Sequence, residues 1–208
     1  GGGGSSGGGG SSGGGGSSGG GEVPQPAVSL AAPEPPPPVN TPSVPLQRVD
    51  PSLMTASEVS AISPEQIATV APEVFRTLAP AVLRGLTPDQ AERLTTAQVN
   101  NIRPKGAAKL RPATVAALAP ANITAMRPAS IARLTPNAVK AMSEEQVQAI
   151  RPAAIAKMRS RQLTAMSPSQ ISSMTASQLK VLSGRQIKVL TKSQVSALSK
   201  SQKKLLGL

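Results

Sequence analysis

Residues 87–102 read TPDQAERLTTAQVNNI, which is two consecutive copies of an eight-residue unit. Every proline after Pro51 has a residue number divisible by eight. Written in this register, residues 55–206 form 19 contiguous octads without insertion or deletion, and Thr87 and Leu94 stand at positions one and eight of their octad. The chain therefore carries a tandem repeat of period eight, and this repeat decides the fold.

The first half of the octad has the composition of a helix start. Position one is Ser or Thr in 11 copies, position two is Pro in 11, and position four is Gln or Glu in 11. A Ser or Thr N-cap accepts a hydrogen bond from the N3 amide, Pro suits the first helical position, and Gln or Glu at N3 accepts from the N–H of the cap. Ten of the 11 Ser/Thr octads carry Gln or Glu at position four, as a capping box requires.

Two octad positions are apolar: position eight in all 19 copies and position five in 18, failing only at Lys203. One continuous helix is excluded, because eight residues rotate about 800° and the apolar stripe would drift about 80° per octad, and because repeated prolines break a helix. A strand is excluded, since positions five and eight would face opposite sides of a sheet. A helix of roughly six or seven residues and a turn of one or two remain.

The pattern thus predicts an all-α fold, a tight superhelical solenoid of very short helices, one per octad, with positions five and eight inside. Small residues at position seven, such as Gly85, predict a close approach of neighbouring turns. Lys203 is expected to act as a polar cap at the C-terminal end of the array.

The chain divides into three segments. Residues 1–21 contain only Gly and Ser in a regular GGGGSS register, which indicates a flexible linker of artificial origin. Residues 22–52 hold ten of the 21 prolines and predict an extended Pro-rich spacer, so a disordered linker is expected ahead of the solenoid of residues 53–208. No run of about 18 apolar residues is present, so no transmembrane segment is expected.

Composition argues against an enzyme. The chain has no Cys and no His, and therefore no thiolate or imidazole for nucleophilic catalysis or a zinc site. Ten scattered acids without the spacing of a calcium loop favour no metal site. Phe75 is the only aromatic residue, which disfavours modules that stack nucleic-acid bases on aromatic rings. We expect no cofactor and no small-molecule substrate.

The stretches LTTAQV at 94–99 and MTASQL at 174–179 resemble the LTTAQVAAL-type octapeptide arrays of very large bacterial secreted or surface proteins. The resemblance covers residues 55–206 and is closer in period than in residue identity. It implies a non-enzymatic structural or adhesive segment, a spacer, stalk or fibre component of an extracellular or cell-surface assembly, with protein partners or self-association. A cytoplasmic location is the alternative.

Charge suggests a second function. The formal net charge is +12, and residues 146–208 hold 11 basic residues and no acid, a block that attracts polyanions such as nucleic acid, anionic lipid or acidic polysaccharide. A solubilising surface on an apolar solenoid is the other interpretation. The candidate polyanion-binding residues are Arg151, Lys157, Arg159, Arg161, Lys180, Arg185, Lys188, Lys192, Lys200, Lys203 and Lys204.

Arginine also recurs at position one of five octads. On a regular superhelix these arginines could form a broken ladder that binds carboxylates or phosphates. Alternatively, arginine only replaces the cap residue at an exposed corner. The candidate ladder consists of Arg103, Arg111, Arg127, Arg151 and Arg159.

Overall fold

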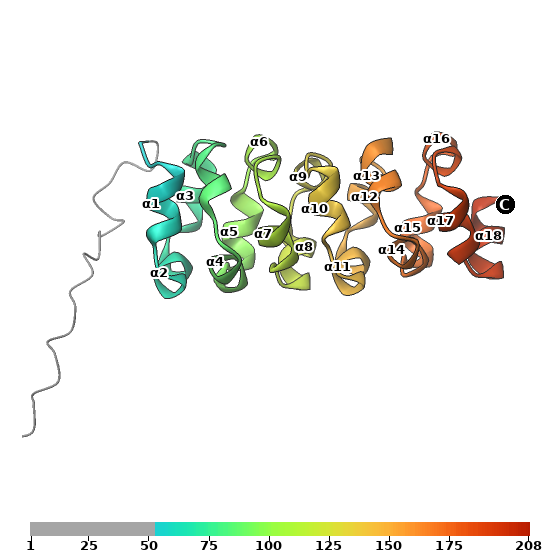
Figure 1. Ribbon diagram of the computed structural model, residues 1–208, viewed down its shortest axis with the longest axis horizontal. Coiled ribbons are helices and arrows are strands. Elements are labelled where there is room, and N and C mark those ends of the chain that lie inside the picture. Colours follow the sequence, from blue (N-terminus) through green and yellow to red (C-terminus); the bar gives the residue numbers. More distant parts are fainter. Residues whose placement is uncertain (1–52) are drawn as a thin grey trace, which may run out of the picture. The chain divides into compact units, whose positions relative to one another are not determined.

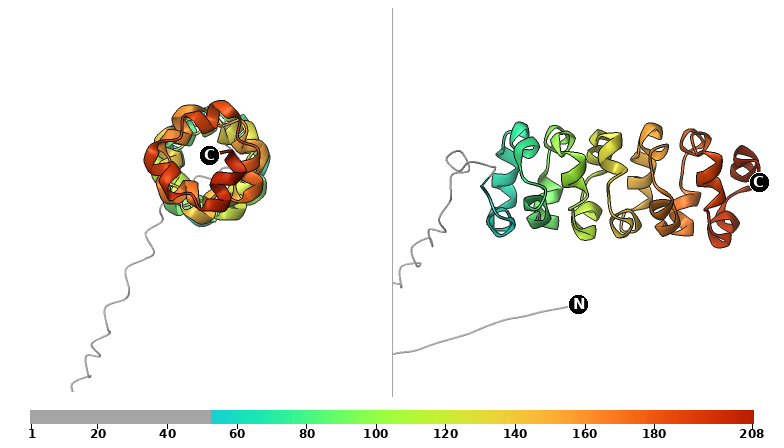
Figure 2. Two further views of the ribbon diagram at one scale, coloured as in Figure 1. Left: turned by 90° about the vertical axis from the view of Figure 1, so that its right-hand side faces the viewer. Right: turned by 90° about the horizontal axis from the view of Figure 1, so that it is seen from above.

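The computed structural model describes residues 53–208, so the predictions for residues 1–21 and 22–52 lie outside the described part of the chain. Each octad forms one short helix, and successive helices meet at corners and wind into a superhelix (Figure 1). Along the superhelix axis the helices form a ring (Figure 2). The all-α solenoid with one helix per octad is confirmed.

We number the octads from 1 (residues 55–62) to 19 (residues 199–206). Octad 4 forms a 3-10 helix, η1, and the other octads form α-helices of four to seven residues. The helices are α1 (Ala56–Ala61), α2 (Pro64–Thr69), α3 (Pro72–Thr77), η1 (Val82–Gly85), α4 (Pro88–Arg93), α5 (Thr96–Asn101), α6 (Pro104–Ala107), α7 (Pro112–Ala116), α8 (Pro120–Ala125), α9 (Pro128–Ile131), α10 (Pro136–Lys140), α11 (Glu144–Ala149), α12 (Pro152–Ile155), α13 (Ser160–Ala165), α14 (Pro168–Ser172), α15 (Ala176–Lys180), α16 (Gly184–Lys188), α17 (Lys192–Ala197) and α18 (Lys200–Leu206).

The capping box starts the helices of ten Ser/Thr octads. In α4, the Thr87 hydroxyl accepts from the Gln90 N–H at 3.2 Å, and the Gln90 Oε1 accepts from the Thr87 N–H at 3.0 Å. Thr135 is the exception, because position four of its octad is Ala138, which has no side-chain acceptor. The predicted helix starts are confirmed.

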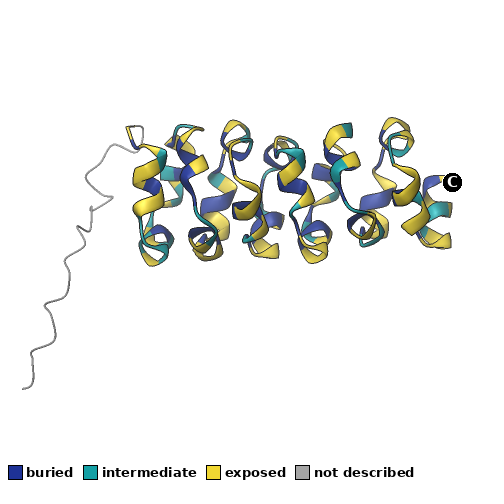
Figure 3. Cartoon of the chain, in the orientation of Figure 1, coloured by how far each residue is buried: buried dark blue, intermediate teal, exposed yellow. Residues whose placement is uncertain are grey.

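Positions five and eight form the core along the axis (Figure 3). Most of these side chains are buried, and burial weakens only near the C-terminal end, where Ile187, Leu190 and Val195 are half-buried. The last helix, α18, ends at Gly207, whose φ of 70° is the left-handed conformation that suits glycine after a helix. Lys203, at position five, is half-buried there, and its carbonyl accepts from the Leu208 N–H at 3.0 Å.

Successive turns of the superhelix pack helix on helix. Each helix contacts the helix of the octad three places further on, as α14 contacts α17 and α10 contacts α13. At Gly85 this contact is so close that an added Cβ would collide with the backbone of Ala56 in α1. The close approach predicted at position seven is therefore present at Gly85.

Position-four glutamines join the turns by hydrogen bonds, an arrangement we call the glutamine clamp. Gln178 uses its Oε1 in the capping box, while its Nε2 donates to the carbonyls of Val147 at 2.8 Å and Ile150 at 2.7 Å. These carbonyls lie 31 and 28 residues earlier in the chain. The same two offsets recur at Gln90, Gln98, Gln146, Gln162, Gln170, Gln186 and Gln194.

The clamp also sets the size of a turn. Helices pack three octads apart, and the clamp reaches four octads back. One superhelical turn therefore takes between three and four octads, about 28 residues.

Some octads without a Ser/Thr cap keep a shorter form of the clamp. Thr114, Asn122 and Ser130 are buried at position four and donate to the position-eight carbonyls 28 residues earlier, at 2.7, 2.8 and 2.9 Å. Gly106, Ala138 and Ala154 have no side-chain donor at this position. The clamp is thus interrupted at three octads.

Replacing Thr87 by alanine tests the capping box. We expect a loss of about 1 kcal/mol, because the Gln90 N–H loses its side-chain acceptor at the start of α4. Amide hydrogen exchange at Gln90 measures the local effect. The control is Ser201→Ala, an exposed site inside α18, where little change is expected. Unchanged protection of the Gln90 amide in Thr87→Ala would show that Thr87 is not the cap.

Candidate polyanion-binding surface

The 11 cations predicted to bind polyanions lie from the start of α12 to the end of α18. All of them are exposed except Lys203, which is half-buried. They do not gather on one side, because they occupy octad positions one, two, three, five, six and seven around nearly two superhelical turns. One of them also has a structural contact: the Arg151 guanidinium donates to the Met126 carbonyl at 2.8 Å.

The five arginines of the candidate ladder occupy N-cap positions, as their register predicts. Arg103, Arg127 and Arg151 start α6, α9 and α12, which pack on one another in series, so three of the five lie on successive turns.

Two of the five arginines also bond to the preceding turn. Arg111 donates to the Leu86 carbonyl at 2.9 Å, and Arg151 donates to the Met126 carbonyl at 2.8 Å. Both carbonyls belong to position eight, the same position that the glutamine clamp uses. The role of the ladder in ligand binding stays a prediction, but these two guanidinium groups have a contact within the fold.

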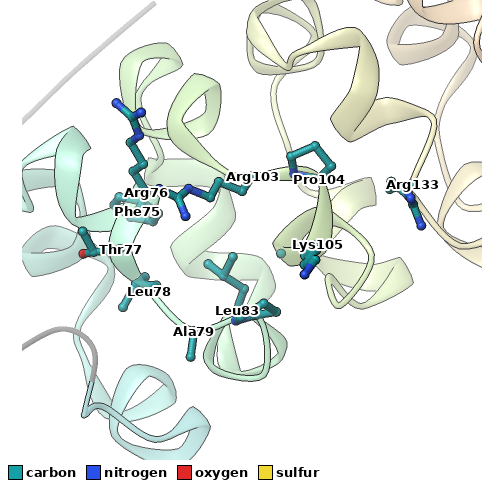
Figure 4. A pocket seen from close by; sticks show the side chains of 12 residues that line it. Phe75, Arg76, Thr77, Leu78, Ala79, Leu83, Arg103, Pro104, Lys105 and Arg133 are labelled. Carbon is teal, nitrogen blue, oxygen red and sulfur yellow. The ribbon is translucent and has the colours of Figure 1, made fainter.

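A pocket of about 560 Å³ lies between successive turns near the N-terminal half of the array (Figure 4). Its apolar wall includes Phe75 and Leu83, which are about 1% exposed, together with Leu78. Figure 4 shows Arg103 extending toward Arg76. No acid lines this pocket, and its charged residues are Arg76, Arg103, Lys105 and Arg133.

Gly106 explains why a pocket forms here. By the clamp register, a glutamine at position 106 would donate to the carbonyls of Phe75 and Leu78, which lie 31 and 28 residues earlier. Glycine offers no donor, and a Cβ at Gly106 would collide with a methyl group of Leu83. Among the described residues, no group donates a hydrogen bond to either carbonyl. Both residues line the pocket, so two free acceptors lie in its wall.

Our sequence analysis missed this cluster. Three of its four cations lie outside residues 146–208, and only Arg103 belongs to the candidate ladder. They come from octads 3, 7 and 10, which a period of eight alone does not bring together. Marking the cations with a period of about 28 residues would have found them, but that period depends on the inter-turn hydrogen bonds.

Titration offers little else in the described part of the chain. Hydrogen bonds from the N–H and the hydroxyl of Thr55 lower the pKa of Glu58, and a hydrogen bond from the Ser143 side chain is the main cause that lowers the pKa of Glu145. Residues 53–208 contain no group of three or more His, Cys, Asp or Glu side chains placed to hold a metal ion. None of the helices described is both long and apolar enough to cross a membrane.

The comparisons with known proteins add no relative. No protein-family model matches the sequence, and no curated protein matches it.

Proposed function

We propose that the octad array is a non-enzymatic structural spacer that holds whatever is joined to its two ends at a fixed separation. The supporting observation is the glutamine clamp, which recurs from Gln90 to Gln194 and ties each turn to the one before it. Each such side chain is buried and holds carbonyls of an earlier turn. A superhelix with both helix packing and hydrogen bonds between turns resists bending more than one held by side-chain packing alone.

The proposal includes the roles that the sequence resemblance implies. A stiff array suits a stalk or fibre component of an adhesive bacterial assembly, at the cell surface or outside the cell. Protein partners or self-association at the ends would give such a segment its place in the assembly.

A pair of spin labels tests the spacer. The chain has no Cys, so Ser57→Cys and Ser201→Cys, at exposed sites in α1 and α18, accept labels without competing thiols. We expect a single narrow distance distribution by double electron–electron resonance. Duplicating residues 143–198, seven octads or about two turns, should lengthen the distance by about 18 Å, because packed helices lie about 8–10 Å apart. A broad distribution, or one that does not lengthen, would contradict a stiff spacer.

A second candidate function is polyanion binding. It is supported by the exposure of nearly all the cations of residues 146–208, a segment that contains no acid. Attraction by charge alone predicts affinity that falls steeply between about 50 and 200 mM salt.

A further inference from the structure

Five exposed cations recur once per superhelical turn. Their residue numbers differ by 29, 28, 28 and 27, and one turn takes about 28 residues, so they lie on successive turns along one side of the superhelix. We call them the cationic column: Arg76, Lys105, Arg133, Arg161 and Lys188.

Two pockets confirm that residues about 28 positions apart are neighbours. The pocket of about 560 Å³ brings Arg76, Lys105 and Arg133 together, with Arg103 beside them (Figure 4). A second pocket, of about 230 Å³, is lined by Ala132 and Leu134 of one turn and by Arg159 and Arg161 of the next. The column therefore passes through two recesses between turns, each lined by arginines.

Acids are placed mostly on the other side. Five of the seven acids in residues 53–208 lie 11 to 13 residues from the nearest member of the column, which is close to half a turn. These five are Glu65, Asp89, Glu92, Glu144 and Glu145. Glu58 lies further along the chain, and Glu73, three residues from Arg76, is the one acid close to the column. The array thus has a basic side and a side that carries most of its acids.

We propose that the cationic column binds a linear acidic polysaccharide laid along the superhelix axis. The inference rests on the second candidate function, polyanion binding, and places the site along the array rather than in residues 146–208. Successive column members are about 9 Å apart along the axis, because packed helices lie at about 8–10 Å. A guanidinium group pairs with a carboxylate or sulfate through two parallel hydrogen bonds.

The chemistry of the larger pocket favours a sugar chain. The carbonyls of Phe75 and Leu78 lack a donor, and sugar hydroxyl groups can supply one while the anionic groups pair with the arginines. The apolar wall of Phe75, Leu78 and Leu83 suits the C–H faces of a sugar ring.

Other polyanions fit less well. Single-stranded nucleic acid is held largely by aromatic stacking, and Phe75, the one aromatic residue, is buried. A flat anionic membrane cannot enter recesses between turns. The phosphates of a DNA duplex wind around its axis, whereas the column runs along one side of the array.

Matched charge variants of the full chain test the proposal. The column variant combines Arg76→Gln, Lys105→Gln, Arg133→Gln and Arg161→Gln. The control removes four exposed cations elsewhere, Arg84→Gln, Arg93→Gln, Lys140→Gln and Lys180→Gln. A third variant, the end variant, combines Lys192→Gln, Lys200→Gln, Lys203→Gln and Lys204→Gln. Every variant lowers the net charge by four, so attraction by net charge alone predicts equal losses.

Binding is measured by fluorescence anisotropy with labelled heparin and polygalacturonate chains, single-stranded DNA and anionic phosphatidylglycerol vesicles, at about 50 and 150 mM salt. We expect the column variant to lose affinity for the polysaccharides roughly 30-fold, as four exposed ion pairs of modest strength require. The control and end variants should stay within about threefold of the parent. Circular dichroism melts confirm that all variants are folded.

Three results would overturn the column. Equal losses in the column and control variants would show attraction by net charge, which leaves polyanion binding standing without this site. A loss confined to the end variant would place the site in residues 146–208. Tighter binding to DNA or vesicles than to either polysaccharide at the same salt would overturn the ligand class, and binding to none of the probes would end both the column and the second candidate function.

Discussion

Replacing Gln178 by alanine should lower the free energy of unfolding by about 2–4 kcal/mol, because it leaves several buried polar groups without a partner. Gln178 is 1% exposed, and its Nε2 donates to the carbonyls of Val147, Gln148 and Ile150 at 2.8, 3.1 and 2.7 Å. Its Oε1 also accepts from the Thr175 N–H at 2.8 Å. Urea denaturation followed by circular dichroism measures the change.

Gln66→Ala is the matched control. Gln66 stands at the same octad position and makes the same capping box with Ser63, but it lies in octad 2, and no earlier turn precedes it in the described part of the chain. Its loss should therefore cost only the cap, about 1 kcal/mol or less. Similar losses at Gln66 and Gln178 would mean that the inter-turn hydrogen bonds add no stability.

Gln178→Glu separates hydrogen bonding from side-chain volume. A carboxylate fills the same space but donates nothing to the carbonyls of Val147 and Ile150, and burial raises the pKa of such a carboxyl group. Because the folded-state pKa is then above the unfolded value, the variant is least stable above the folded-state pKa and recovers stability as the pH falls through it. A variant as stable as the parent at pH 7 would contradict the clamp.

The local structure was readable from the sequence because it depends on neighbours in the chain. The pairing of Thr87 with Gln90 lies within one octad, and it predicts where a helix starts. The apolar residues at positions five and eight, such as Ala91 and Leu94, predict which side chains form the core. These features give one helix per octad without any knowledge of the turn.

The number of octads in a turn was not predicted, because the residue that sets it has two functions. A glutamine at position four, such as Gln178, is fully explained as a cap partner, and its bonds to Val147 and Ile150 leave no local trace. A cue was present in octads without a Ser/Thr cap. Asn122 and Ser130 are polar at position four although they complete no capping box, which points to a distant acceptor.

The candidate site depends on the same missing quantity. Grouping cations by distance along the chain selects residues 146–208, whereas grouping them by superhelical turn selects Arg76, Lys105, Arg133 and their successors. Charge on a solenoid is arranged by the turn, so a run of like charges in the sequence spreads around the array. The structure therefore supplied the arrangement, while the sequence supplied the residues.

Deleting a whole octad should leave the array folded, whereas deleting a single residue should disrupt it. Removal of residues 111–118, which form α7, moves every later octad back by one complete unit. Helices then still meet equivalent helices three octads away. Gln146, which now donates to Val115 and Leu118, would face the carbonyls of Ala107 and Leu110, which hold the same octad positions. We expect mean helicity close to that of the parent and one cooperative melt.

Deletion of Ala116 alone changes the register of everything that follows. Leu118 would leave its core position, and each later octad would be offset by one residue, about 100° of helical rotation, from its contacts on the earlier turn. Because contacts reach three to four octads, the mismatch spans a full superhelical turn on each side. We expect a loss of more than about 4 kcal/mol, the scale of several misplaced core side chains. Circular dichroism melts of the two deletions make the comparison, and an equal loss of helicity in both would contradict an array in which stability comes from octads meeting in register.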